Sequence, residues 1–145
     1  MARDGYESDL NRLCVMDIAT GKKTFVTSQR NFDTNVDAFC WTPDSRGFYL
    51  TGVWNATVRI YHASLDGRIF QVSGDSWNDF GSVQMLGNKQ LLATRHSMLR
   101  PDELYVVTPS KKEKQAKVEA ITDENGEIFA QLALPKLQQR WVKTT

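Results

Sequence analysis

The sequence has few of the residues on which most active sites depend. Its 145 residues include two cysteines, Cys14 and Cys40, and two histidines, His62 and His96. Two cysteines make no disulfide framework, and these four residues lack the spacing of zinc ligands. A Gly-x-Ser-x-Gly nucleophile motif is absent, and neither histidine has an evident nucleophile and carboxylate partner. We therefore expect buried cysteines, histidines in strands or at a polar rim, and no metal, cofactor or catalytic residue.

An excess of one charge is also missing, as is any long apolar run. The chain has 18 basic and 17 acidic residues, a net charge of +1. Such a balance gives no strong field for nucleic acid or an anionic membrane, and we expect neither as a partner. Glu113 interrupts the lysines of residues 111–117, which predicts a solvated hairpin. No apolar run approaches the roughly 18 residues of a membrane-spanning helix.

The composition leaves the cellular compartment open. The opening residues 1–5 are polar and lack the apolar centre of a signal peptide. We expect a periplasmic or secreted protein if a signal precedes this sequence, and a cytoplasmic one otherwise.

A strand–turn–strand pattern occurs three times in the chain. The three units begin at Cys14, Ile60 and Leu104, which are 46 and 44 residues apart. Four short strands at a period of 40 to 45 residues are typical of a β-propeller blade. One such unit cannot bury its apolar faces alone and must stack on its neighbours.

The pattern predicts an all-β fold, a partial β-propeller of about two and a half four-stranded antiparallel blades with a short helical or irregular tail. The predicted propeller covers residues 1–124, with blades at 10–28, 36–73 and 80–122. The first blade has only its last two strands. Gly21 suits a turn with positive φ between them. We expect the strand edges left open by incomplete blades to favour self-association.

The tail departs from the repeat. Apolar residues within 125–134 have near-helical spacing, and Pro135 follows as a stop signal. Residues 137–144 then predict a separate strand that carries Trp141. We interpret 125–145 as a linker and strand that lead to another domain.

One turn has a recognisable chemistry. Trp41 ends a predicted inner strand and Thr42-Pro43-Asp44-Ser45 follows it. Proline presets φ, and the Asp and Ser side chains can bond nearby backbone groups. The tryptophan ring is expected to pack between blades, so this motif predicts structure and no chemistry.

The candidate binding residues are Arg3, Glu7 and Asp9, in the polar segment before the first strand. On one face of a propeller, the carboxylates could meet a peptide amino terminus and Arg3 a carbonyl or carboxylate. A charged hairpin tip bonded to itself is the alternative. Trp54 and Trp77 lie near strand ends, where packing between blades is favoured over a place at the rim.

These motifs together resemble a known family. The segments 2–13, 41–45 and 93–105 are similar in order and spacing to the amino-terminal propeller of prolyl oligopeptidase family serine peptidases, in their dipeptidyl peptidase IV-like and acylaminoacyl-peptidase-like branch. In that family the propeller caps an α/β-hydrolase domain with a Ser–Asp–His triad and admits only short peptides. Residues 139–145 resemble the strand that leads into the hydrolase domain.

The resemblance implies a chain that gates and positions short peptides, while acyl transfer takes place in a hydrolase domain outside it. The fragment alone is then expected to be inactive. Its partners would be the peptide substrate, the remaining blades and the hydrolase domain. This chain lacks the adjacent glutamates with which dipeptidyl peptidase IV holds the substrate amino terminus. A non-enzymatic propeller module that binds a protein or ligand fits the same residues.

Overall fold

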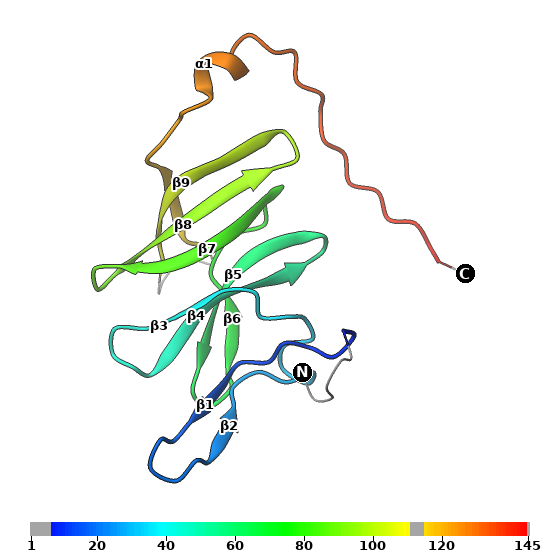
Figure 1. Ribbon diagram of the computed structural model, residues 1–145. Coiled ribbons are helices and arrows are strands. Elements are labelled where there is room, and N and C mark those ends of the chain that lie inside the picture. The colour runs from blue at the N-terminus through cyan, green and yellow to red at the C-terminus, as the bar shows by residue number, and fades with distance from the viewer. Residues whose placement is uncertain (1–6, 111–114, 145) are drawn as a thin grey trace.

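A computed structural model describes residues 7–110 and 115–144. This part of the chain is nearly all β, with strands in three antiparallel sheets (Figure 1). The first sheet contains β1 (Cys14–Met16) and β2 (Lys23–Phe25). The second contains, in order, β3 (Phe39–Trp41), β4 (Gly47–Trp54), β5 (Thr57–Ser64) and β6 (Ile69–Gln71). The third contains β7 (Asn78–Leu86), β8 (Gln90–Ser97), β9 (Arg100–Thr108) and β10 (Lys117–Ala120).

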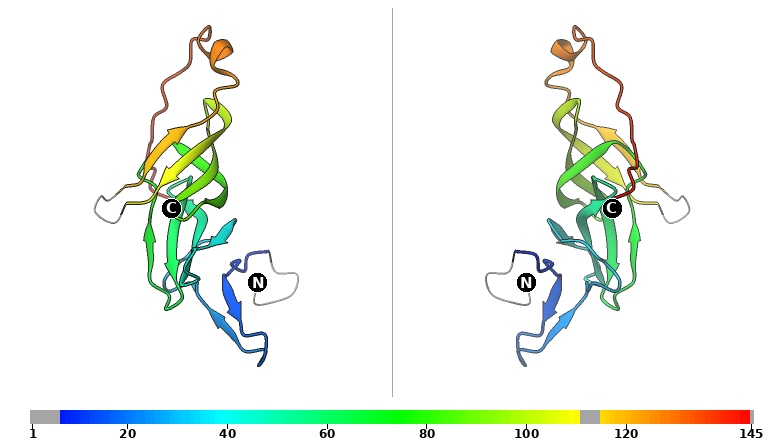
Figure 2. Two further views of the ribbon diagram at one scale, coloured as in Figure 1. Left: turned by 90° about the vertical axis from the view of Figure 1, so that its left-hand side faces the viewer. Right: turned by 90° about the vertical axis from the view of Figure 1, so that its right-hand side faces the viewer.

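The predicted all-β, partial propeller-like fold is confirmed. A two-stranded unit precedes two four-stranded units, and within each unit every strand pairs with the next along the chain. Figure 2 shows the sheets following one another along one direction, with the β1–β2 hairpin at one end and the helix α1 (Gly126–Phe129) at the other.

The second sheet packs against a neighbour on each of its faces. Successive residues of β5 point to opposite sides, so one strand contributes to both contacts. Tyr61 and Ala63 pack toward the first sheet, whereas Ile60 packs toward the third. The cluster toward the first sheet comprises Leu13, Val26, Phe32, Phe48, Leu50, Tyr61 and Ala63. The cluster toward the third comprises Ile60, Val72, Phe80, Val83, Leu91, Ala93 and Val107. Each unit thus completes its core on a neighbour, as the repeat predicts.

The predicted turns form with the expected chemistry. Gly21 has a φ of +69° and donates its N–H to the Asp17 carbonyl at 2.8 Å. In the Thr42–Gly47 turn, Asp44 Oδ1 accepts hydrogen bonds from the Thr42 hydroxyl at 2.7 Å and the Arg46 N–H at 3.1 Å. The β4–β5 turn consists of two residues, Asn55 and Ala56, whose φ values are +50° and +62°.

Two side chains differ from expectation. The Trp41 ring is half-exposed and packs on Phe48 of the adjacent strand, with ring centroids 4.0 Å apart, because β3 is an edge strand among the described residues. Cys14 is exposed rather than buried, and Cys40 is half-buried; both are free thiols. Burial raises the pKa of the Cys40 thiol.

The tail also differs from the sequence-based expectation. The helix α1 is a single turn without a buried residue, and no strand forms over residues 137–144. A strand needs a partner for its backbone hydrogen bonds, and none lies beside this segment in the described structure. The expected lead into another domain stays a prediction. No helix of the described residues has the length and apolar character needed to cross a membrane.

Ile60 and Ile128 give a matched test of the packing between the second and third sheets. Ile60 is fully buried and Ile128 is 60% exposed. We expect Ile60→Ala to lower the free energy of unfolding by about 2–5 kcal/mol, since the cavity would lie between two sheets. Ile128→Ala should change it by less than about 0.5 kcal/mol. Urea unfolding followed by circular dichroism measures both, and equal effects would contradict this packing.

The Thr42–Asp44 turn gives a pH test. The Thr42 hydroxyl, the main cause, lowers the pKa of the Asp44 carboxyl below its ordinary value. A lowered pKa in the folded state contributes stability above the ordinary carboxyl pKa, and that stability is lost as the pH falls through the lowered value, below about pH 4. Thr42→Val should raise the pKa of Asp44 in a ¹³C NMR titration and weaken this acid dependence. An unchanged pKa would exclude the hydroxyl as the cause.

Candidate functional site

One side of the sheets gathers three of the connections between strands. It carries the β4–β5 turn at Asn55–Ala56, the β6–β7 connection at residues 72–77 and the β8–β9 turn at Met98–Leu99. We call this side the terminal face, because the C-terminal segment returns along it from α1 (Figure 1). Leu137 to Trp141 line a cleft of about 380 Å³ there, opposite the β4–β5 turn and Trp77.

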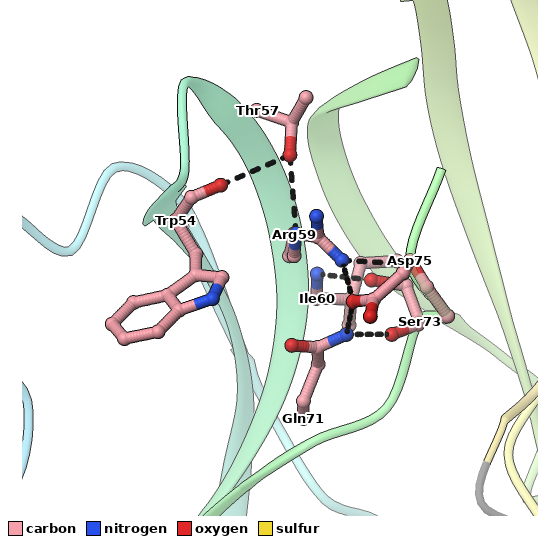
Figure 3. A network of polar contacts seen from close by, with 8 residues as sticks. Trp54, Thr57, Arg59, Ile60, Gln71, Ser73 and Asp75 are labelled. Atoms are coloured by element: carbon pink, nitrogen blue, oxygen red, sulfur yellow. Dashed lines mark hydrogen bonds and ion pairs between the residues drawn. The ribbon is translucent and has the colours of Figure 1, made fainter. Parts of the chain in front are cut away.

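A buried arginine organises the centre of the terminal face (Figure 3). Arg59 on β5 is 7% exposed, and its guanidinium forms an ion pair with Asp75. It also donates to the Thr57 hydroxyl at 3.1 Å and to the Gly74 carbonyl at 3.3 Å. A buried guanidinium requires such partners, because its desolvation is otherwise costly.

Neighbouring bonds fix the loop that carries Asp75. Gln71 Nε2 donates to the Ser73 carbonyl at 2.6 Å and to Asp75 Oδ1 at 3.2 Å. The Ser73 hydroxyl accepts the Ile60 N–H at 2.9 Å (Figure 3). Asp75 contacts Arg59 and Gln71 through Oδ1, and its side chain is 82% exposed. The network therefore holds a carboxylate in a fixed place while leaving it open to a ligand.

Apolar and amide groups surround this carboxylate. A cleft of about 210 Å³ is lined by Asn55, Thr57, Arg59, Asp75, Ser76, Trp77 and Gln139. Trp54 and Trp77 are 56% and 49% exposed, so they lie at the rim and not between blades as expected. The cleft therefore offers the Asp75 carboxylate as an acceptor for a cation. Beside it, the Trp77 ring offers an aromatic surface for an apolar side chain.

The two histidines lie in strands, as expected, but have different surroundings. His62 on β5 packs between Tyr49 and Phe70, and burial lowers its pKa, so the imidazole is neutral at neutral pH. His96 on β8 does have carboxylate partners, contrary to expectation. Its Nδ1 lies 3.0 Å from Asp102 Oδ1 and its Nε2 3.9 Å from Asp79 Oδ2.

These contacts make no catalytic triad. In the described part of the chain, neither histidine forms a hydrogen bond to a serine or cysteine. Groups of three or more potential metal ligands are likewise not found among the described residues. Asp79 Oδ1 instead accepts the Val58 N–H at 2.7 Å, which links the third sheet to the second.

The predicted binding residues are only partly described. Arg3 lies outside the described residues, Glu7 is exposed and Asp9 is half-buried. Just after them, Asn11 donates its N–H to Asn35 Oδ1 at 2.7 Å and accepts the Val36 N–H at 3.0 Å. This segment thus lies beside the chain that enters β3. A role for Arg3, Glu7 and Asp9 in positioning a substrate stays a prediction.

Sequence reasoning missed Arg59 and Asp75. The available signal was a charged residue between Val58 and Ile60, within a strand that is otherwise buried on both faces. Asp75 gave no signal, because it lies in an irregular loop between strands.

Comparisons with known proteins place the chain in context. No protein-family model matches it. Over its whole length it is 41% identical to dipeptidyl-peptidase 5 of Porphyromonas gingivalis. It is also 34% identical over its whole length to dipeptidyl-peptidase 5 of Porphyromonas endodontalis.

The chain is thus similar along its whole length to part of two proteins named dipeptidyl-peptidase 5. It spans about a fifth of the length of each dipeptidyl-peptidase 5 that it matches. The described residues therefore correspond to one part of a longer peptidase sequence.

The Arg59–Asp75 pair can be tested through stability. We expect Arg59→Ala to lower the free energy of unfolding by about 1–3 kcal/mol, because the buried packing of the arginine is lost and the Thr57 hydroxyl and Gly74 carbonyl lose their donor, while the exposed Asp75 carboxylate stays in water. Asp66→Ala, in the exposed Arg68–Asp66 pair, should cost at most about 1 kcal/mol. Chemical denaturation of both variants measures the difference. A mild effect of Arg59→Ala would show that the buried network does not hold the loop.

Proposed function

We propose that this chain is the part of a serine-type dipeptidyl peptidase that gates and positions short peptides. The observation that carries the proposal is the 41% identity over the whole chain to a dipeptidyl-peptidase 5, of which it spans only a fifth. The described residues hold two histidines without a nucleophile bonded to either. Acyl transfer to serine would then be carried out by residues outside this sequence.

The terminal face supports this role through its chemistry. An enzyme that releases dipeptides must recognise a free amino terminus, and a fixed carboxylate can do so through charge-assisted hydrogen bonds. Asp75 supplies such a carboxylate, and Arg59 and Gln71 hold it. Trp77, which lines the same cleft as Asp75, would contact the side chains of the first residues. Glu7 and Asp9 are further candidates for the same amino terminus.

A non-enzymatic propeller module is the alternative. It fits the fold equally well, since fold does not determine function. The relatives favour the peptidase, because both carry a dipeptidyl-peptidase name and match every part of this chain.

A chimera tests the proposal. This chain would replace the matching segment of the P. gingivalis relative, and cleavage of dipeptidyl chromogenic substrates would be measured. We expect the chimera to be active and N-acetylated substrates to be poor. Asp75→Asn should raise KM by about tenfold, the loss expected for one charge-assisted bond. The matched control is Asp66→Asn, since Asp66 also pairs with an arginine but is not at the terminal face.

The outcomes separate the alternatives. A folded but inactive chimera would contradict the peptidase role. Equal KM values for Asp75→Asn and Asp66→Asn would remove Asp75 from substrate binding. Cleavage by the isolated 145-residue chain, abolished by a serine-directed inhibitor, would contradict acyl transfer outside this sequence.

A further inference from the structure

A second pocket lies where the third sheet meets α1. It has a volume of about 420 Å³ and is lined by residues of β8, β9, β10 and the 122–130 segment. We call it the arginine pocket; the lining residues that matter here are Arg95, Arg100, Glu103, Tyr105, Asn125 and Phe129. Nothing described above gives it a role.

The two arginines are held by aromatic rings. The Arg95 guanidinium carbon lies 4.9 Å from the centre of the Tyr105 ring and 5.8 Å from that of Phe80. The guanidinium carbon of Arg100 lies 4.5 Å from the centre of the Phe129 ring. Stacking of this kind fixes a guanidinium plane while its N–H groups stay available. Within the described residues neither guanidinium donates a hydrogen bond to the protein; Arg95 is half-buried and Arg100 is exposed to solvent.

Their natural partner is engaged elsewhere. Glu103 lies directly opposite Arg95 in the β8–β9 register, where a cross-strand ion pair would be expected. Its carboxylate instead accepts hydrogen bonds from the Thr122 hydroxyl and, at 3.4 Å, from the Asn125 N–H. Within the described residues, neither Arg95 nor Arg100 forms an ion pair, and Arg95 Nε is buried without a hydrogen-bond partner.

The remaining charged groups limit what the pocket can bind. Asp123 also lines it, against Gly126 at the start of α1, and His96 at its edge is paired with Asp102. The Thr122 hydroxyl, as the main cause, lowers the pKa of Glu103, so that carboxyl is ionised at neutral pH. Two cations therefore face two anions. The two carboxylates would repel a dianionic phosphate more strongly than a singly charged carboxylate, and a planar carboxylate matches the fork of guanidinium N–H groups.

We propose that the arginine pocket binds a carboxylate, held by Arg95 and Arg100. A peptide can supply it from its C-terminus or from an aspartate or glutamate side chain. The pocket is separate from the Arg59–Asp75 network, and the inference does not depend on the proposed peptidase role.

Binding to the chain itself provides the test. ¹⁵N chemical shifts would be followed while N-acetylglycylglycine or its C-terminal amide is added, to test a terminal carboxylate. N-acetylaspartate N-methylamide and the asparagine counterpart would test a side-chain carboxylate. We expect at least one acid to shift the amides of residues 95–103, and its amide partner to shift none of them.

Variants separate the pocket from general charge. Arg95→Gln should weaken binding of the active acid by about tenfold or more. Arg140→Gln removes the same charge from the exposed tail and should change binding less than about twofold. If Arg95→Gln does not fold, Arg100→Gln serves the same purpose. Equal binding of acids and amides, no binding of either acid, or an unchanged affinity in folded Arg95→Gln or Arg100→Gln would overturn the proposal.

Discussion

Burial of the second sheet on both faces is the constraint on which the rest of the structure depends. Strand β5 shows it most clearly, because Ile60 fills the contact with the third sheet while Tyr61 and Ala63 fill the contact with the first. Neither outer sheet has a core of its own without this strand. The three units therefore behave as one packed array, in which each interface contributes to the stability of the units on both sides.

The candidate site is a consequence of the same strand. Arg59 lies two residues before Tyr61, so both side chains are on the same side of β5. Arg59 is near the end of the strand at the terminal face, and it occupies a buried position that an apolar residue would otherwise take. Its buried guanidinium needs acceptors, and the connection to the third sheet supplies them through Gly74 and Asp75. The need of the buried Arg59 for an acceptor thus positions the exposed Asp75 carboxylate, which is the candidate binding group.

Most of the fold could be predicted from the sequence, because the repeat and the turn residues act locally. Pro43, Asp44 and Gly21 specify their turns wherever the chain goes next. The predicted strand at 137–144 failed for the opposite reason, since a strand depends on a partner that local sequence does not reveal. Trp54 and Trp77 were expected between blades, and their exposure follows from their places at the end of β4 and in the loop before β7.

The candidate site was harder to predict than the fold. Arg59 and Asp75 are brought together by the return of the chain after β6. His96 likewise meets Asp79 and Asp102 across three strands, through register alone. Such pairs need knowledge of which strands are neighbours. The sequence pattern predicts the order of the strands, but it does not predict how far each side chain is buried.

The β4–β5 turn makes the two walls of the 380 Å³ cleft unlike each other. Ala56 holds a left-handed conformation that costs a residue with a Cβ roughly 1–2 kcal/mol compared with glycine. Its alanine methyl group also narrows the conformations that the turn can sample. The cleft therefore has one wall, from Asn55 to Thr57, that is restricted by this turn, and an opposite wall, from Leu137 to Trp141, that belongs to no helix or strand.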